Sequence, residues 1–331
     1  MSIDWKRFSN IINSHNSFLV TSHIRPDCDA LGSALGMGLV LESLGKQIRI
    51  VTGDPVPPNL AFIDPDNRIE HLGGDVSLEE LSGLEVMIVL DTSAWAQLGP
   101  MGDVLRADRK VKMVLDHHVS EDDLGAEYFK NTTAEATGRL VAEAAGELGV
   151  PLTAEIATPL FAAQATDTGW YRFKSTTGDA LRVAASLVDA GAVPQDIYSD
   201  IYEQDTLGRL RLRGIVLARI ETDLDGRMAH TYIRHKDFET SGAVPSDTED
   251  VINLTLAIKG VEFAVILVEQ ASGNFKLSFR SRCGVNCAQL AQQFGGGGHK
   301  AAAGAGIDGP FEEAQRKVLA AVRQAMQAKK D

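Results

Sequence analysis

Residues 17–44 read SFLVTSHIRPDCDALGSALGMGLVLESL. The apolar run from Ser17 to Ser22 predicts a β-strand, and the pattern from Ala30 to Leu44 predicts an α-helix. Three residues whose side chains can bind metal ions follow the strand: His23, Asp27 and Asp29. The stretch therefore predicts one strand-loop-helix unit of an α/β fold, with polar side chains at the carboxyl end of the strand.

The same pattern continues through the first half of the chain. Further apolar runs, rich in Val, Ile and Leu, predict strands at Gln47 to Thr52, Val86 to Leu90 and Val111 to Leu115. Helical periodicity then dominates three segments: Ala136 to Gly149, Ala154 to Ala165 and Thr177 to Ala190. Continuous apolar strands separated by helices indicate a parallel sheet that is covered by helices on both faces.

The second half predicts a smaller α/β domain. Gly191 to Pro194 marks the end of the first domain, and a long helical stretch from Pro194 to about Ile220 could bridge the two halves. Strands are predicted at Met228 to Ile233, Val261 to Glu269 and Asn274 to Arg280, with helices near Asp250, Ala288 and Phe311. We therefore expect domains at residues 1–190 and 223–331, joined by a helical linker at 191–222.

Composition limits the class of protein. A chain of 331 residues fits two domains of common size, and 44% hydrophobic with 23% charged residues is a globular composition. We expect no membrane span, because no apolar run reaches 18 residues. The N-terminus lacks the features of a signal peptide, and three cysteines are too few for a disulfide framework, so we expect a cytoplasmic protein.

The charge is globally acidic and locally basic. A net charge of -13 argues against long nucleic acid as a ligand. However, the window from Gln270 to Ile307 contains no Asp or Glu, and it holds five basic or histidine side chains: Lys276, Arg280, Arg282, His299 and Lys300. This distribution favours a small anionic ligand.

Four acidic or histidine groups follow elements of the first domain. Besides the group after Ser17 to Ser22, they are Asp91, the triplet Asp116, His117 and His118, and Asp167 at a helix end. Taken singly, an Asp at such a place is most often a cap or turn residue, Asp27 and Asp29 could cap the following helix, and His117 could be a buried structural histidine. Ligands of open α/β sheets collect outside the carboxyl ends of the strands, so four groups at one edge predict a site.

The residue types indicate divalent metal ions. Imidazole and carboxylate ligands without a thiolate favour Mn²⁺ or a related ion over Zn²⁺. Two ions about 3.5–4 Å apart can share a carboxylate and a water, lower the pKa of that water and stabilise the displaced oxygen. Phosphoester hydrolysis needs this chemistry, because an anionic nucleophile must approach an anionic phosphate.

These motifs resemble those of the DHH phosphoesterases, and the order, spacing and length are similar to the NrnA-type nanoRNase/pAp phosphatase group. The motifs are His23-x-x-x-Asp27-x-Asp29, Asp91-Thr-Ser, Asp116-His117-His118 and Asp167-Thr-Gly-Trp170. The segments Phe279-Arg280-Ser281-Arg282 and Gly295-Gly-Gly-Gly-His299-Lys-Ala-Ala-Ala-Gly304 resemble the DHH-associated domain. The resemblance implies a DHH catalytic domain at 1–190 and a DHH-associated substrate-binding domain at 223–331.

The resemblance also implies a role for each site residue. One metal would be held by His23, Asp27 and Asp91, and the other by Asp29, Asp91, His117 and Asp167, with Asp91 bridging. His118 would face the scissile phosphate, and Asp116 would orient the histidines as an acceptor behind them. The implied cofactor is a pair of Mn²⁺ ions, with Co²⁺ or Mg²⁺ as alternatives.

The glycine-rich run predicts a second binding element. Read alone, it favours a flexible loop, but His299 and Lys300 follow it directly inside the acid-free window. Glycines let the backbone approach a ligand closely and can form an anion-binding nest. The resemblance implies that this element and the preceding strand bind the nucleotide through Arg280, Ser281, His299, Gly296, Gly297, Gly298 and Lys300.

The predicted function is hydrolysis of short oligoribonucleotides to mononucleotides, and also of pAp to AMP. The alternatives are a pApA or cyclic di-AMP phosphodiesterase and a non-catalytic nucleotide sensor, although a sensor would be expected to have lost a ligand. Three positions depart from the group's pattern and bear on substrate preference: Gln97, Glu121 and Arg139. The resemblance further implies a homodimer.

Overall fold

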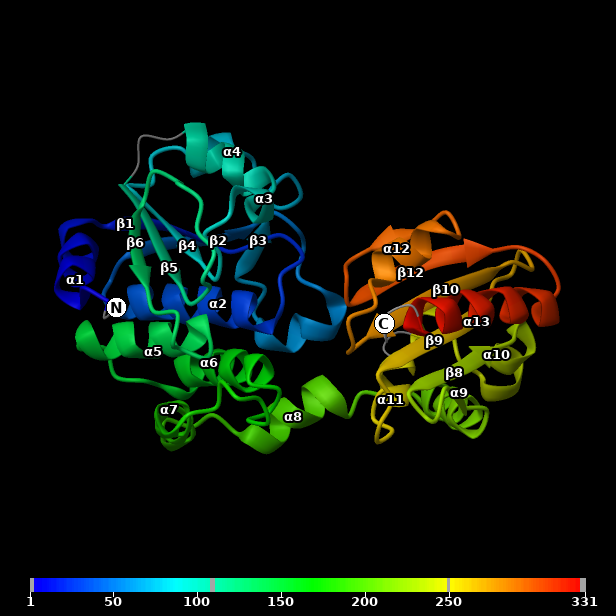
Figure 1. Ribbon diagram of the computed structural model, residues 1–331. Coiled ribbons are helices and arrows are strands. Elements are labelled where there is room, and N and C mark those ends of the chain that lie inside the picture. Colours follow the sequence, from blue (N-terminus) through cyan, green and yellow to red (C-terminus); the bar gives the residue numbers. More distant parts are fainter. Residues whose placement is uncertain (1–2, 108–110, 249–250, 328–331) are drawn as a thin grey trace. The chain divides into compact units, whose positions relative to one another are not determined.

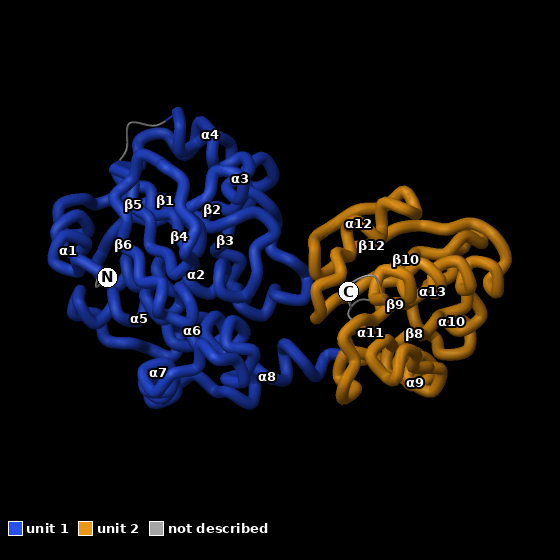
Figure 2. The backbone as a smooth tube through the Cα atoms, viewed as in Figure 1, with its two compact units in different colours: residues 1–204 blue, residues 205–331 orange. Residues whose placement is uncertain are grey.

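The computed structural model describes residues 3–107, 111–248 and 251–327. It divides into two compact units, residues 1–204 and residues 205–331 (Figure 2). Each unit has its own six-stranded sheet and its own helices (Figure 1). Among the described residues, no helix is both long and apolar enough to cross a bilayer.

The sheet of unit 1 is entirely parallel, in the order β3-β2-β1-β4-β5-β6. The four predicted strands are confirmed. The edge strands β3 and β6 were not predicted. The strand bounds are β1 (Ser17–Thr21), β2 (Gln47–Thr52), β3 (Ile69–His71), β4 (Val86–Leu90), β5 (Val111–Asp116) and β6 (Glu127–Lys130).

Helices cover both faces of this sheet, as the sequence predicts (Figure 1). Phe18 and Val20 of β1 pack into a core with α2, α5 and α6, whereas Leu19 points to the other face and packs with α3 and α4. The helices of the unit are α1 (Trp5–Ser14), α2 (Cys28–Ser43), α3 (Trp95–Leu98), α4 (Pro100–Ala107), α5 (Thr137–Glu147), α6 (Ala154–Asp167), α7 (Gly178–Asp189) and α8 (Pro194–Tyr202), with 3-10 turns at Pro58–Ile63 and Glu79–Leu81.

Two glycines bring α2 and α6 close together. A Cβ on Gly32 would lie 2.3 Å from the carbonyl oxygen of Pro159, and one on Gly36 would lie 2.5 Å from Leu160 Cδ2. Asp27 caps the start of α2 by accepting a hydrogen bond from the Ala30 amide at 3.0 Å. This packing brings the start of α2 and the end of α6, which is Asp167, to the same edge of the sheet.

The predicted helical stretch from Pro194 to about Ile220 is wrong as a single helix. It is broken between α8 and α9 (Leu207–Ala218), which begins where the Thr206 hydroxyl accepts a hydrogen bond from the Arg209 amide at 3.0 Å. Asp205 also pairs with Arg209, with 3.3 Å between Oδ1 and Nε. These local contacts start a new helix, and the boundary between the two units falls in the break.

Unit 2 has a mixed sheet in the order β11-β12-β10-β9-β8-β7, in which only the β8–β9 pair is parallel among the described strands. Strands β7, β11 and β12 were not predicted as strands. The bounds are β7 (Glu221–Asp223), β8 (Met228–Ile233), β9 (Phe263–Glu269), β10 (Phe275–Ser281), β11 (Gly297–Gly298) and β12 (Ala302–Ile307). The helices are α9, α10 (His235–Ser241), α11 (Val251–Thr255), α12 (Cys287–Gln292) and α13 (Phe311–Gln327), with a 3-10 turn at Pro245–Thr248.

Strand β10 separates two cores. Its residues Phe275, Leu277 and Phe279 pack with α12 and α13 on one face of the sheet. On the other face, α9 and α11 pack against β8 and β9 through Ile266 and Val268. The helix predicted near Asp250 is α11, and residues 249–250 lie outside the described part of the chain.

Candidate metal centre

Asp91 lies at the middle of the candidate site, immediately after β4. Its two carboxylate oxygens face different histidines: Oδ2 lies 3.4 Å from His23 Nε2, and Oδ1 lies 3.5 Å from His117 Nε2. The carboxylate is 2% exposed, and the backbone of Asp91 is left-handed with φ of 60°. A buried carboxylate whose oxygens point in two directions is suited to bridge two cations.

The first ligand group is His23, Asp27 and Asp91. His23 Nε2 lies 3.8 Å from Asp27 Oδ1, and Nδ1 of the same ring lies 3.0 Å from the carbonyl oxygen of Ile24. The backbone contact fixes the ring so that Nε2 faces the carboxylates. Burial opposes the charged ring, but the contact with Asp91 outweighs it and raises the pKa of His23 to about 9.

The second ligand group is Asp29, His117 and Asp167. His117 Nε2 lies 3.8 Å from Asp29 Oδ2 and 3.6 Å from Asp167 Oδ2, while its Nδ1 contacts the carbonyl oxygen of Ala134 at 3.2 Å. The two separations between His117 Nε2 and the carboxylates exceed the 2.7–3.2 Å of an ordinary hydrogen bond. The ligand atoms of the group lie within 4.8 Å of one another, so they can surround one ion.

Asp29 is held in place by the start of α5. Its Oδ2 and Oδ1 accept hydrogen bonds from the amides of Thr137 and Gly138, each at 2.8 Å, and the Thr137 hydroxyl donates to Asp91 Oδ1 at 2.9 Å. The sequence reasoning missed Thr137, whose contacts lie 108 and 46 residues away along the chain. The position of Thr137 at the start of a predicted helix could have indicated this contact, because backbone amides at a helix start bind carboxylates.

The carboxylates are crowded enough to require a counter-charge. Burial, followed by the charges of Asp91 and Asp167, raises the pKa of Asp29 well above its usual value. Burial also raises the pKa of Asp167 to about 6, with Asp91 contributing. Divalent cations would remove this like-charge repulsion, and every donor atom is an oxygen or an imidazole nitrogen. The residues therefore fit a metal centre.

His118 and Asp116 form a pair beside this centre. Asp116 Oδ1 accepts a hydrogen bond from the backbone amide of His118 at 3.0 Å and lies 2.8 Å from Nδ1 of the His118 ring. The same Nδ1 lies 3.7 Å from Asp91 Oδ1. Asp116 Oδ2 accepts from the Ser93 hydroxyl at 2.7 Å and lies 3.2 Å from Lys130 Nζ. Despite burial, the contacts with His118 and Ser93 lower the pKa of Asp116 to about 2, and the contact with Asp116 raises the pKa of His118.

Ser93 and Lys130 extend this pair. Lys130 Nζ donates to Ser93 Oγ at 2.6 Å and to the carbonyl oxygen of Ser120 at 2.8 Å. The sequence indicated Ser93 only as part of the Asp-Thr-Ser motif and missed Lys130. A lone Lys ending a short strand carries no sequence signal for such a contact.

The residues predicted in unit 2 lie on β10 and on the turn before β12. Arg280 is half-buried and donates to the carbonyl oxygen of Phe279 at 3.1 Å, whereas the Ser281 hydroxyl donates to the carbonyl oxygen of Cys283 at 3.0 Å. The glycine-rich run forms β11 and pairs with β12. His299 and Lys300 follow it and are exposed.

Two glycines of this run, Gly296 and Gly298, are required by close backbone approach. A Cβ on Gly296 would lie 2.1 Å from the carbonyl oxygen of Gly304, and one on Gly298, whose φ is 141°, would lie 2.7 Å from Ala303 Cα. A Cβ on Gly297 would meet nothing within 4 Å. Gly295 also has open space, but its φ of 69° favours glycine, so Gly297 alone among the four has neither a close contact nor a left-handed backbone.

Comparison with known families agrees with this geometry. Residues 17–164 match the DHH family, N-terminal domain, and residues 225–328 match the DHHA1 domain. The chain is 32% identical over 311 residues to the bifunctional oligoribonuclease and PAP phosphatase NrnA of Thermus thermophilus, with 92% of this chain and 89% of the relative covered. The chain belongs to the DHH family.

Two further relatives support the DHH assignment. The NrnA of Bacillus subtilis, of the same description, is 26% identical over 309 residues, covering 92% of this chain and 93% of that protein. A crystal structure of an exopolyphosphatase-related protein from Bacteroides fragilis superposes with a TM-score of 0.78 at 25% identity, covering 98% of this chain and 95% of that one. The DHH and DHHA1 architecture expected from the motifs is thereby confirmed.

The three departures from the DHH pattern lie near the centre but outside its ligand groups. Gln97 accepts a hydrogen bond from the Thr92 hydroxyl at 2.6 Å, and the Glu121 carboxylate lies 3.4 Å from Lys130 Nζ. Arg139 forms ion pairs with Glu135, just before α5, and with Glu143 on α5. All three make internal polar contacts, so each supports the surroundings of the ligands.

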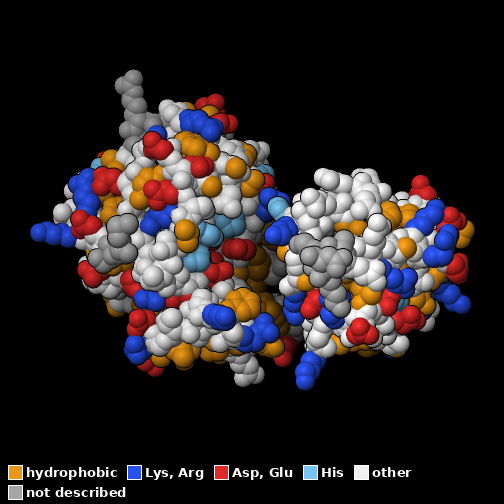
Figure 3. Space-filling view, in the orientation of Figure 1, with side chains coloured by type: hydrophobic (Ala, Val, Ile, Leu, Met, Phe, Trp, Pro, Cys, Tyr) orange, Lys and Arg blue, Asp and Glu red, His pale blue; other side chains and the backbone are white. Residues whose placement is uncertain are grey.

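Histidine and acidic side chains gather on the visible face of unit 1. On that face, histidine side chains, pale blue, lie together with acidic side chains, red (Figure 3). This agrees with the distances above, which join residues from the loops after β1, β4 and β5 and from the end of α6.

Proposed function

We propose that this chain is a metal-dependent phosphoesterase that hydrolyses short oligoribonucleotides to mononucleotides and pAp to AMP. The observation that carries the proposal is the bridging placement of Asp91, whose two oxygens face His23 and His117 separately. Relatives that cover about nine tenths of the chain are named oligoribonuclease and PAP phosphatase, which supports this choice of substrates.

We assign two divalent ions to the centre. His23, Asp27 and Asp91 would hold one ion, and Asp29, Asp91, His117 and Asp167 would hold the other. The nitrogen and oxygen donors favour Mn²⁺, with Co²⁺ or Mg²⁺ as alternatives. When bound, such ions supply Lewis-acid stabilisation of charge at the phosphate and lower the pKa of water.

His118 contacts the scissile phosphate in this proposal. Its Nδ1 faces Asp116, which leaves Nε2 available to donate a hydrogen bond, and 46% of the side chain is exposed to receive a substrate. The low pKa of Asp116 keeps that residue a carboxylate at neutral pH, so it holds the ring in orientation and favours its charged form. A fixed imidazolium would stabilise the negative charge that develops on the phosphate oxygens.

Unit 2 contributes nucleotide binding. Arg280 offers a planar fork to a phosphate, and Ser281, His299, Lys300 and the turn of Gly296, Gly297 and Gly298 supply further donors. The absence of Asp and Glu between Gln270 and Ile307 supports this role, since no carboxylate of that segment competes for these donors. A cytoplasmic homodimer is part of the same proposal. The absence of disulfides among the three cysteines fits its location.

A substrate series tests the proposal. The purified chain with Mn²⁺ is incubated with pAp, pApA, cyclic di-AMP and RNAs of two to about twenty-four nucleotides. We expect release of mononucleotides from the shortest RNAs and of AMP from pAp, and loss of both after complete chelation. Preference for cyclic di-AMP would favour the cyclic-dinucleotide alternative, and binding without any hydrolysis would favour the sensor.

A further inference from the structure

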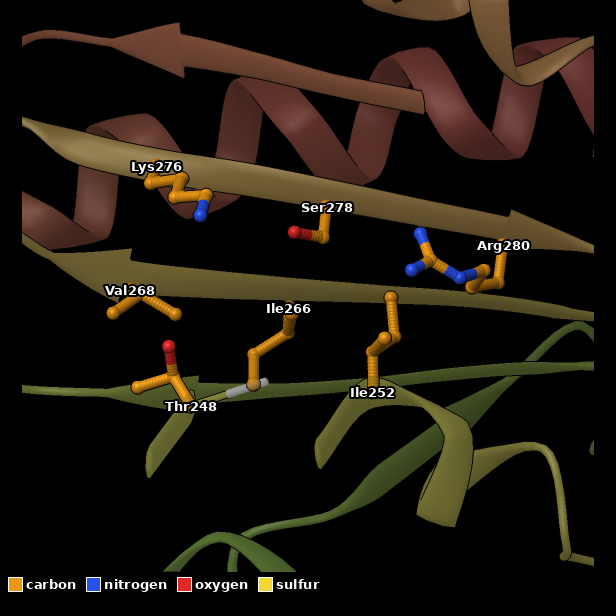
Figure 4. A pocket seen from close by; sticks show the side chains of 7 residues that line it. All are labelled: Thr248, Ile252, Ile266, Val268, Lys276, Ser278 and Arg280. Carbon is orange, nitrogen blue, oxygen red and sulfur yellow. The ribbon is translucent and has the colours of Figure 1, made fainter. Parts of the chain in front are cut away.

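One pocket of unit 2 contains residues to which the proposed function assigns no role. Its volume is about 250 Å³, and its lining residues come from β9, β10, the 3-10 turn that ends at Thr248, and α11 (Figure 4). Lys276, Ser278 and Arg280 alternate along β10 and therefore share a face. Opposite them on β9 lie Val268, which pairs with Lys276, and Ile266, which pairs with Ser278.

The polar side of this pocket is cationic, and within the described residues its two cations have no carboxylate partner. The Lys276 ammonium and the Arg280 guanidinium lie on either side of the Ser278 hydroxyl (Figure 4). Within the described residues, Lys276 and Ser278 have no ion pair or side-chain hydrogen bond, and Arg280 has only its bond to the Phe279 carbonyl oxygen. None of the described lining residues is acidic.

Three arginines that lie near the same sheet differ in this respect. Arg219 pairs with Asp237, Arg227 with Glu262 at 3.2 Å, and Arg234 with Glu269 at 2.8 Å, each through a carboxylate. Two neighbouring cations without a carboxylate repel each other, and an anion between them would remove the repulsion.

The opposite side of the pocket is apolar. Ile252, Ile266 and Val268 line it, and Thr248 adds one hydroxyl and one methyl group. A smaller neighbouring pocket of about 230 Å³ shares Thr248, Val268 and Lys276 and includes Glu269, whose carboxylate already accepts from Arg234 and from the His235 amide. Cationic side chains on one side of the pocket and apolar side chains on the other suit a ligand that has a phosphate at one end and a base or sugar ring at the other.

We propose that this pocket binds one nucleoside monophosphate unit, with its phosphate between Lys276, Ser278 and Arg280 and its nucleoside against Ile252 and Ile266. A pocket of about 250 Å³ lies just below the roughly 300–1,000 Å³ of typical ligand sites, so it holds one nucleotide and not several. The inference rests on the proposed function, because it places the substrate unit next to Arg280 on a defined surface and makes Lys276 and Ser278 specificity-determining residues.

The test is a titration of the full chain, with methyl-labelled isoleucines, by AMP in buffer that contains Mg²⁺. AMP is a product of the proposed reactions and not a substrate, so its binding is observed without turnover. We expect the methyl signals of Ile252 and Ile266 to shift on titration. Unchanged signals at both residues under saturating AMP would overturn the proposal.

Three variants test whether AMP binding depends on the positive charge of Lys276. Lys276→Ala should weaken AMP binding at these signals by about tenfold or more, since a charge-assisted hydrogen bond is lost. Lys276→Arg should restore most of the affinity, and Lys259→Ala, which removes an exposed lysine outside the pocket, should bind as the wild type does. Equal affinities for Lys276→Ala and Lys259→Ala would contradict the assignment.

Failure of this pocket and failure of the proposed function give different results. RNA hydrolysis with Mn²⁺ is measured separately for the wild type. Hydrolysis of RNA without any effect of Lys276→Ala on AMP binding would refute the pocket alone. AMP binding as expected without RNA hydrolysis would leave the pocket in place and refute the proposed reaction.

Discussion

At the scale of single residues, backbone strain accompanies the ligands. Asp91 has a φ of 60°, Arg25 between His23 and Asp27 has 51°, and Trp170 shortly after Asp167 has 58°. Left-handed backbone is uncommon for residues other than glycine, and it tends to persist at functional sites where the surroundings enforce it. The ligand motifs could be recognised from residue types and spacing, but this conformation could not, because it depends on the packed sheet edge.

Replacement of the bridging carboxylate should abolish activity and preserve the fold. Asparagine tolerates a left-handed backbone and can still accept from Thr137, but it removes the charge shared between the two ligand groups. We expect Asp91→Asn to lower kcat/KM by about 10³-fold or more. This loss exceeds the roughly 10–100-fold loss of activity that is typical when a residue hydrogen-bonded to a metal ligand is replaced. Activity with Mn²⁺ and thermal melting are the measurements. Asp103→Asn, at an exposed position on α4, is the control that should retain both.

Asp116 should make the stability of the chain pH-dependent. Its pKa is about 2 in the fold and 3.8 ordinarily, so the carboxylate contributes about 2 kcal/mol above pH 4, and this contribution is lost as the pH falls toward 2. We expect the difference in unfolding free energy between wild type and Asp116→Asn, both with chelator, to narrow from pH 5 to pH 2. A difference independent of pH would show that the Asp116 contacts do not depend on its charge.

At the scale of elements, apolar runs predicted the central strands well. Strands β1, β2, β4 and β5 were found because each is rich in apolar residues, as strands of a doubly covered parallel sheet are. Strand β12, which reads Ala-Ala-Gly-Ala-Gly-Ile, was missed because Ala and Gly disfavour strands, and only pairing with β10 and β11 stabilises it. Likewise, the contacts of Thr137 with Asp29 join residues 108 apart, which no local pattern predicts.

The contact of α2 with α6 sets the distance between two groups of ligands. A Cβ at Gly32 would meet the Pro159 carbonyl oxygen at 2.3 Å, and backbone atoms cannot rotate away. We expect Gly32→Ala to destabilise the chain by about 1–3 kcal/mol, as overpacking does. In contrast, Gly146→Ala on α5 meets nothing within 4 Å and should stabilise it by about 0.5–1 kcal/mol. Urea unfolding of both variants measures the two effects, and equal signs would contradict this packing argument.

At the scale of the whole molecule, acidic and basic chemistry are divided between the two units. The carboxylate-rich centre belongs to unit 1, whereas the unpaired cations of β10 belong to unit 2. The net charge of -13 therefore does not describe the surface that a substrate phosphate would meet on unit 2. Each unit has its own buried core, so a substitution on β10 should leave the metal ligands intact.

Arg280 should contribute to substrate selection more than to bond cleavage. Arg280→Ala should lower kcat/KM for a dinucleotide at least about tenfold more than for bis-p-nitrophenyl phosphate, because the ester lacks the nucleotide that Arg280 positions. The ratio of the two kcat/KM values is the measurement, and Arg316→Ala, at an exposed position of α13, is the matched control. An equal fall for both substrates would assign Arg280 to the metal centre or the fold.

The central claim is that Asp91 bridges two metal ions, and anomalous diffraction from crystals grown with Mn²⁺ tests it directly. We expect two anomalous peaks in unit 1, about 3.5–4 Å apart, each next to a different oxygen of Asp91. His23 and Asp27 should contact one peak, and Asp29, His117 and Asp167 the other. A single peak, or two peaks of which only one contacts Asp91, would contradict the account.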